Sequence, residues 1–267
     1  MTAAIRARGL RVSFGGIAAL AGVDLDVAPR ARLGVIGPNG AGKTTLLDTV
    51  CGFVRADAGS VLVDGADVSG LTADARARRG LARSFQDARL FPSMTVHEAL
   101  LVAATPAGRG LGHVAGILGL PSVRRAERAA RATAGRLLDQ LGLAGYRDVF
   151  IGELSTGMRR LVDLAGVLAR EPKVVLLDEP SAGLAQAEVA ELAPLLLRVA
   201  EASQATLLIV EHDIPLICAV AEELVAMESG RVVARGAPAE VLADPAVIES
   251  YLGTDQRTIA RSGRPGR

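Results

Sequence analysis

Apolar residues form short unbroken runs in some parts of the chain and alternate with polar residues in others. The unbroken runs are RLGVIG (32–37), KVVLLDE (173–179) and TLLIVEH (206–212). Runs of this length with β-branched residues predict strands that are buried on both faces of a parallel sheet. Helical patterns separate or follow them at 43–51, 155–170, 186–202 and 213–220. This succession of strands and crossover helices predicts an α/β fold with a mainly parallel sheet.

Two further segments alternate between apolar and polar residues with a period of two. They are ALAGVDLDVA (19–28) and GSVLVDGADV (59–68). This alternation predicts an antiparallel β subdomain, with turns at Gly22 and at Asp64–Gly65.

The chain between about 87 and 160 has the pattern of helices, which predicts an inserted helical subdomain. Three arginines there, Arg124, Arg128 and Arg131, share one face of a helix, and we interpret them as a solvated surface. The sequence therefore predicts a single domain over 1–253, with a core at 1–86 and 161–253. A disordered basic tail is expected at 254–267.

The composition narrows the class of protein. Half of the residues are hydrophobic and only 3% are aromatic, which is typical of a globular chain. The net charge of +1 disfavours a nucleic-acid partner. Cys51 and Cys218 form no C-x-x-C pair, so neither a zinc site nor a disulfide framework is indicated. The first residues lack the apolar stretch of a signal peptide, and the most apolar window, 100–121, is interrupted by charged residues and proline.

GPNGAGKTT (37–45) matches the phosphate-loop pattern G-x-x-x-x-G-K-[ST], and it lies between a predicted strand and a predicted helix. Backbone N–H groups of such a loop wrap the phosphates of a nucleotide, and the helix start adds partial positive charge. Lys43 is expected to reach the β- and γ-phosphates, and the Thr44 hydroxyl to bind Mg²⁺. A dinucleotide fingerprint is the alternative, and it fails because no third glycine follows Gly42. The expected ATP-binding residues of the loop are Gly37, Pro38, Asn39, Gly40, Ala41, Gly42, Lys43, Thr44 and Thr45.

VVLLDEP (174–180) places two carboxylates at the carboxyl end of a buried strand, where ligands bind in open α/β sheets. Asp178 is expected to hold Mg²⁺ through water. Glu179 points to the other side and is placed to orient or deprotonate an attacking water. The alternative, a solvated acidic pair at a strand end, is disfavoured by the phosphate loop.

Three more segments carry candidate chemistry. His212 ends the next apolar run, at the same sheet edge as Lys43, and is expected to contact the γ-phosphate. Gln86 follows a short strand, and its amide can bind Mg²⁺ or water. ELSTGMRRLVDLAG (153–166) starts as a helix that Ser155 caps and in which Gly157 allows close approach to the backbone.

The order of these parts resembles that of the ATP-binding cassette (ABC) ATPases, over residues 4 to 253. By this resemblance Phe14 stacks on adenine, Gln86 links the site to a membrane partner, and His212 is the switch histidine. LSTGM (154–158) corresponds to the family signature. Because two such cassettes pair head to tail, Ser155, Thr156 and Gly157 would complete an ATP site whose lysine belongs to the partner.

Three features are similar to the ATPases of branched-chain amino-acid importers: RSFQDARLFPSMTVHEALLVA, an insertion at about 103–130, and the ending VIESYLG. This likeness implies permease subunits in the membrane, an external binding protein that acts indirectly, and a location on the inner face of the cell membrane. The paired ATPase is expected to be a different chain, with a homodimer as the alternative. A lipopolysaccharide exporter and a soluble cassette ATPase of DNA repair or translation remain the other readings.

Two positions depart from the family pattern. Thr156 stands where the family usually has glycine, and Ala185 in SAGLA stands where it usually has aspartate or a similar polar residue. Lys43, Glu179 and His212 are all present, so hydrolysis is predicted at the site that this chain holds itself. A regulator that binds nucleotide without turnover is the alternative that the two departures leave open.

Overall fold

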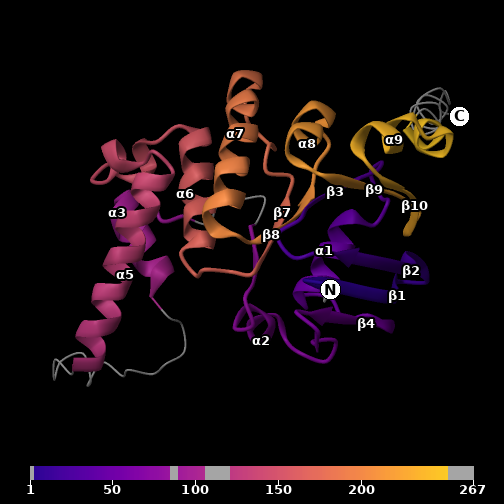
Figure 1. Ribbon diagram of the computed structural model, residues 1–267, viewed down its shortest axis with the longest axis horizontal. Coiled ribbons are helices and arrows are strands. Elements are labelled where there is room, and N and C mark those ends of the chain that lie inside the picture. Colours follow the sequence, from indigo (N-terminus) through magenta and orange to yellow (C-terminus); the bar gives the residue numbers. More distant parts are fainter. Residues whose placement is uncertain (1–2, 85–89, 106–120, 252–267) are drawn as a thin grey trace, which may run out of the picture. The chain divides into compact units, whose positions relative to one another are not determined.

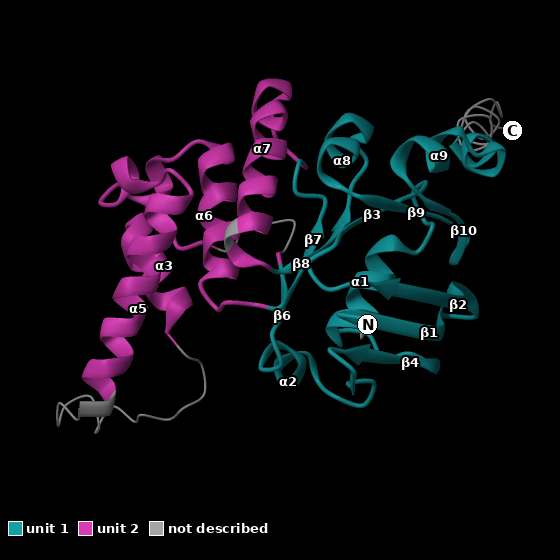
Figure 2. Cartoon of the chain, in the orientation of Figure 1, with its two compact units in different colours: residues 1–83, 173–181, 205–267 teal, residues 84–172, 182–204 magenta. Residues whose placement is uncertain are grey.

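The chain folds into two compact units, and the computed structural model describes residues 3–84, 90–105 and 121–251 (Figure 1). The first unit contains residues 1–83, 173–181 and 205–267, and the second contains 84–172 and 182–204 (Figure 2). Each unit is therefore built from separate stretches of the sequence.

The first unit contains a six-stranded sheet with the order β10-β9-β3-β8-β7-β6. Its strands are β3 (Arg32–Ile36), β6 (Leu81–Arg83), β7 (Val174–Asp178), β8 (Thr206–Val210), β9 (Glu223–Glu228) and β10 (Arg231–Gly236). All neighbouring pairs are parallel except β9 and β10. Every residue of β7 and β8 is buried, which agrees with the unbroken apolar runs in the sequence. The carboxyl ends of β3, β7 and β8 consequently share one edge of the sheet.

A second, four-stranded antiparallel sheet has the order β2-β1-β4-β5. It is formed by β1 (Ile5–Phe14), β2 (Ile17–Val27), β4 (Ala58–Val63) and β5 (Ala66–Asp67). The turn predicted at Asp64–Gly65 is present, and both residues have positive φ angles. The turn predicted at Gly22 is wrong, because β2 runs through this residue as a bulge between the pairs Leu10–Val23 and Arg11–Ala21. One unpaired residue at φ 98° bends the strand without ending it.

The helices of the first unit include α1 (Lys43–Cys51), α2 (Ala73–Ala77), α8 (Ile214–Val220) and α9 (Pro238–Ala243). Helix α1 contacts β2, β6 and β7, so it packs between the two sheets. The apolar residues of both sheets and of α1 form one continuous core, with residues such as Ile5, Leu10 and Leu46 inaccessible to solvent. This packing fixes the helix that begins at Lys43 against the strand that ends at Asp178.

The second unit is helical. It contains α3 (Val96–Ala104), α5 (Pro121–Gln140), α6 (Thr156–Leu168) and α7 (Gln186–Ser203), with short 3-10 turns at Ala144–Tyr146 and Ile151–Glu153. Helix α3 begins with a reciprocal capping box between Thr95 and Glu98 and packs on α5 and α6. The inner face of α5 is apolar, whereas its arginines at 124, 128 and 131 are exposed, as predicted for a solvated face.

The sequence predicts a helical part over about 87–160. In the structure the second unit extends further, and it contains all of α6 and α7. The assignment of one domain to 1–253 stays a prediction. Gln86, most of the predicted insertion and the basic tail at 254–267 lie outside the described residues. Among the described helices, none combines the length and the apolar character that a membrane span requires.

Candidate functional site

The phosphate loop joins β3 to α1 and is held by the antiparallel sheet and by the turn between β9 and β10. The N–H of Gly230 donates to the carbonyl of Ala41 at 3.0 Å, and the N–H of Ala21 donates to the carbonyl of Gly230 at 2.8 Å. Gly42 has a φ of 98°, and a Cβ on it would come within 2.4 Å of the Ala19 carbonyl oxygen. The loop therefore needs glycine at this position both for its backbone angle and for close packing.

Helix α1 starts without a side-chain cap and without an acidic residue in its first turn. The first N–H groups of a helix have no partner within the helix and carry partial positive charge. Because no side chain caps α1, its first N–H groups are available to donate hydrogen bonds to a phosphate.

Lys43 lies at the start of α1 and is almost fully buried, with 5% of its surface exposed. Its Nζ donates to the carbonyl oxygens of Gly37 at 2.7 Å and of Pro38 at 3.0 Å. Burial lowers the pKa of this ammonium group, and the negative charges of Glu179 and Asp178 act in the opposite direction. Lys43 is therefore close enough to Glu179 and Asp178 to interact with their charges, as the sequence indicated.

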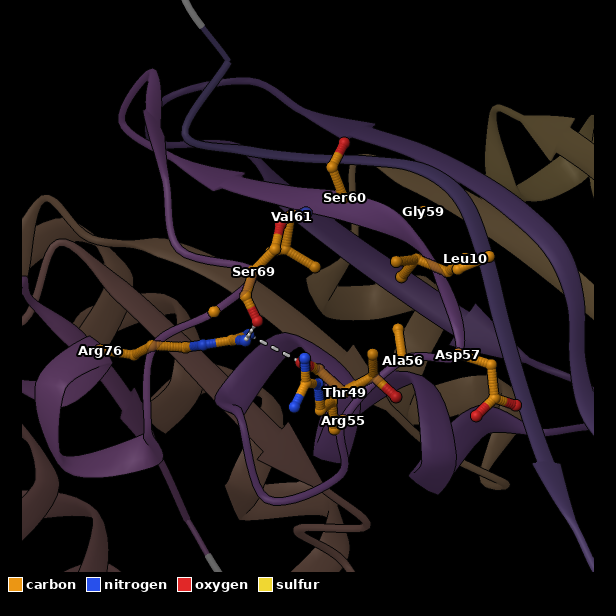
Figure 3. A pocket seen from close by; sticks show the side chains of 12 residues that line it. Leu10, Thr49, Arg55, Ala56, Asp57, Gly59, Ser60, Val61, Ser69 and Arg76 are labelled. Atoms are coloured by element: carbon orange, nitrogen blue, oxygen red, sulfur yellow. Dashed lines mark hydrogen bonds between the residues drawn. The ribbon is translucent and has the colours of Figure 1, made fainter.

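A pocket of about 190 Å³ lies beside the other end of α1 and is lined by Thr49 of α1, by residues 55–61 and by the buried Arg76 of α2 (Figure 3). Its guanidinium group donates to the carbonyls of Thr49 at 2.7 Å, Val50 at 2.8 Å, Ser69 at 3.0 Å and Leu71 at 3.1 Å. The bonds to Thr49 and Val50 cap carbonyls in the last turn of α1, and the bonds to Ser69 and Leu71 join this end of the helix to the segment before α2. Arg76 thus stabilises the end of the helix, and nothing in its contacts points to phosphate binding.

Asp178 ends β7 and is 7% exposed. Its Oδ2 accepts a hydrogen bond from Arg83 at 2.6 Å, whereas its Oδ1 is buried without a hydrogen-bond partner in the described structure. A buried carboxylate oxygen without a partner costs free energy, and a cation or a bound water can satisfy it. The Thr44 hydroxyl, in the first turn of α1, is exposed and is also a hard oxygen ligand. These two side chains fit a magnesium ion.

Glu179 follows β7 in an unusual backbone conformation. Its φ is 46°, in the left-handed region that costs a non-glycine residue roughly 1–2 kcal/mol. Its N–H donates to the carbonyl of Val210 at the end of β8, at 2.9 Å, and this bond holds the conformation. Such backbone strain at a strand end is common at functional sites.

His212 contacts Glu179 directly, with 2.6 Å between Nε2 and Oε1. When the Glu179 carboxylate accepts in this contact, the histidine donates through Nε2. Both side chains stay partly open to solvent, with 41% of His212 and 24% of Glu179 exposed. The pair can orient a water molecule and receive its proton, which is the chemistry of general-base catalysis.

Glu211 is a residue of this site that our sequence reasoning did not identify. It is 1% exposed, and its carboxylate accepts from the N–H of Ser181 at 2.7 Å, the Ser181 hydroxyl at 2.9 Å and the N–H of His212 at 3.0 Å. It thereby fixes the backbone on both sides of the Glu179–His212 pair. The available signal was an acidic residue directly after the buried strand β8, where a buried charge without a partner is costly.

In the second unit, Ser155 caps α6 as predicted, and its Oγ accepts from the N–H of Met158 at 3.2 Å. Thr156 is exposed at the first position of this helix. The N–H of Gly157 donates to Glu188 of α7 at 3.3 Å, and the other oxygen of Glu188 accepts from the N–H of Ala185 at 2.9 Å. A carboxylate of this chain therefore lies where an anion is expected to bind at the start of α6.

Phe14, the residue predicted to stack on adenine, ends β1. Its surface is 53% exposed, so its ring is accessible for stacking. Ala185 precedes α7, and without a polar side chain it offers only its backbone there. Gln86 lies outside the described residues, and its role stays a prediction.

A family model described as ABC transporter matches residues 20–182. The chain belongs to this family. A second model, described as branched-chain amino acid ATP-binding cassette transporter, matches residues 231–256 of this ABC protein.

Curated relatives agree over almost the whole chain. Identity is 36% with the high-affinity branched-chain amino acid transport ATP-binding protein BraF of Pseudomonas aeruginosa, over 92% of this chain and 96% of the relative. The corresponding LivG protein of Escherichia coli is also 36% identical, with the same coverage. The lipopolysaccharide export system ATP-binding protein LptB of Escherichia coli is 33% identical over 96% of this chain and 99% of the relative.

Solved structures give the same fold. A nucleotide-free ATP-binding cassette of an ABC transporter has a TM-score of 0.79 and 29% identity, with 93% of this chain and 98% of that chain covered. An ATP-binding cassette in its ADP conformation has a TM-score of 0.79 and 30% identity, with 95% and 100% covered. The predicted α/β cassette fold and the ATPase class are thereby confirmed, and ATP is the nucleotide of this family.

Proposed function

We propose that this ABC ATPase drives an importer of the branched-chain amino acid type from the inner face of the membrane. The proposal is supported by the two relatives at 36% identity and by the family model at 231–256, within the carboxyl-terminal part of the chain. The observation that carries the catalytic part is the 2.6 Å contact between His212 and Glu179, beside Lys43 and Asp178.

In this proposal the phosphate loop and the start of α1 bind the phosphates of ATP, and Lys43 moves from the loop carbonyls to the β- and γ-phosphates. Glu179 orients the attacking water and accepts its proton, and His212 holds the Glu179 carboxylate through Nε2. Asp178 and Thr44 would hold Mg²⁺, which neutralises charge on the phosphates when bound. Phe14 stacks on adenine, and Gln86 is assigned to the metal or the attacking water.

The site is completed by the paired ATPase in this proposal. The start of α6 in one chain, with Ser155, Thr156 and Gly157, faces the γ-phosphate that the other chain holds. The phosphate then takes the place of the Glu188 carboxylate at the Gly157 N–H, because one helix start cannot hold two anions side by side. Thr156 adds a Cβ and a hydroxyl beside this position, and Ala185 removes a polar group, so the two sites of the pair need not be equal.

We assign the permease subunits and a second, different ATPase as partners, with an external binding protein acting through the permeases. The test uses tagged Glu179→Gln protein, which is expected to trap ATP, in a pull-down from detergent-solubilised membranes with ATP present. Mass spectrometry of the retained proteins should find two permeases and a second ATPase. The matched control, Glu179→Gln with Lys43→Ala, should lose the ATP-dependent part of this set.

Recovery of only soluble proteins or nucleic acid would contradict the transport proposal and leave the ATPase assignment intact. Recovery of exporter subunits, with this chain pairing with itself, would favour the export reading that the 33% relative represents.

A further inference from the structure

Arg83 is the last residue of β6 and contacts Asp178, the candidate metal ligand. Its NH2 group donates to Oδ2 of Asp178 at 2.6 Å, and its NH1 group pairs with Oδ1 of Asp48 on α1. The side chain of Arg83 is 7% exposed and that of Asp178 is 10% exposed. One guanidinium group therefore joins the strand that ends at Asp178 to the helix that begins at Lys43.

The guanidinium group engages only one oxygen of Asp178. Oδ2 is bonded to Arg83, while Oδ1 is buried without a hydrogen-bond partner among the described residues. Rotation of the carboxylate would break a charge-assisted bond, which is among the stronger hydrogen bonds in proteins. Arg83 therefore fixes which oxygen of Asp178 remains available to a cation.

The environment also holds Arg83 itself in place. Its guanidinium carbon lies 5.8 Å from the centre of the Phe53 ring, within the range of a cation–π contact. Burial works to lower its pKa, but hydrogen bonds with Asp48 and Asp178 outweigh burial and raise the pKa above its usual value. The side chain is consequently a fixed positive charge beside two carboxylates. When ionised, Arg83, Asp48 and Asp178 together carry a net charge of about −1. A divalent cation bound between this cluster and the phosphates of a nucleotide would meet negative charge on both sides.

We propose that Arg83 is a positioning residue for the metal: by holding Oδ2 of Asp178, it keeps Oδ1 directed to the site and sets the affinity for Mg²⁺ in the nucleotide complex. This inference rests on the proposed function, because it requires Asp178 to be the metal-side acid. It differs from a purely structural role, in which Arg83 only links α1 to β7 through its two ion pairs.

The experiment compares Arg83→Gln and Arg83→Lys with Asp48→Asn, which removes a charge from the same cluster and leaves the Arg83–Asp178 pair. Binding of a fluorescent ATP analogue is measured in EDTA and then across a Mg²⁺ titration, and thermal unfolding is measured without nucleotide. For Arg83→Gln we expect affinity in EDTA within about twofold of the wild type. We expect the Mg²⁺ concentration at half-maximal effect to rise about tenfold or more, as for other residues that support a metal ligand.

Arg83→Lys keeps the charge with a single-point donor and should recover part of this shift. Asp48→Asn should lower the unfolding temperature while its Mg²⁺ midpoint stays within about twofold of the wild type. If Arg83→Gln does not fold, the comparison of Arg83→Lys with Asp48→Asn decides. An unchanged Mg²⁺ midpoint in folded Arg83→Gln, or a shift in Asp48→Asn equal to that of the Arg83 variant, would overturn the proposal. If nucleotide binding by the wild type does not respond to Mg²⁺, it is the metal assignment of Asp178 that fails.

Discussion

The two ends of α1 differ in whether a side chain binds their backbone groups. The start at Gly42 and Lys43 has no side-chain cap, and so its N–H groups can serve a phosphate. The end is held by Arg76, whose guanidinium group donates to the carbonyls of Thr49 and Val50 there and to two carbonyls of the segment before α2. A helix that must hold an anion at one end is thus anchored at the other.

Replacing Arg76 with Met keeps most of the side-chain volume but leaves these carbonyls without their donor. We expect a loss of about 2–4 kcal/mol in the free energy of unfolding, because buried groups lose their partners. Urea unfolding measures it. The control is Arg78→Met, since this side chain is 63% exposed and pairs with Asp74, which is also exposed; its effect should stay within about 0.5 kcal/mol. Equal losses in the two variants would refute the anchoring role.

The elements of the core could be predicted because their patterns are local. Helix α1 has the predicted bounds 43–51, and the three buried strands lie within the predicted runs. Asp178, Glu179 and His212 were found from their position at strand ends. Arg83, Glu188 and Glu211 were not found, because their partners lie 95, 31 and 30 residues away in the sequence. Only the tertiary structure brings such pairs together.

Helix α6 contains a partly buried carboxyl group, Asp163, from which we expect a pH-dependent contribution to stability. Burial raises the pKa of Asp163, with Arg160 acting against it, and Oδ2 has no hydrogen-bond partner in the described structure. A carboxyl whose pKa is higher in the folded state favours folding below its unfolded pKa, and this stability is lost as the pH rises through the folded pKa.

We therefore expect Asp163→Asn to become more stable relative to the wild type as the pH rises from about 4 to about 7.5. Urea unfolding at several pH values measures the difference in the free energy of unfolding between the two proteins. The control is Asp139→Asn, an exposed position of α5. A difference that falls with rising pH, or an identical trend in the control, would argue against the buried charge.

The whole molecule is incomplete as a catalyst in our account, because the start of α6 serves a second ATPase. Glu188 now bonds the Gly157 N–H that the partner's γ-phosphate would use. In the proposed pair the partner's γ-phosphate would replace the Glu188 carboxylate at this N–H, and the charge of Glu188 would oppose pairing.

The variant Glu188→Gln removes this charge and keeps the length of the side chain. ATP-driven association in the Glu179→Gln background should then need roughly two- to fivefold less protein, since one charge at a helix start contributes about 0.3–1 kcal/mol. Analytical ultracentrifugation with and without ATP measures it. Glu191→Gln, exposed on the same helix, is the control. Weaker association in Glu188→Gln than in the control would show that the carboxylate supports pairing.

The role of Glu179 in hydrolysis is tested by the ATP turnover of Glu179→Gln beside the wild type, with ATP affinity measured on the same samples. If Glu179 orients the attacking water and accepts its proton, turnover falls by about a hundredfold or more. The ATP dissociation constant should stay within about twofold, because the phosphate loop and Lys43 are intact. Turnover equal to that of the wild type, at equal ATP affinity, would contradict the account.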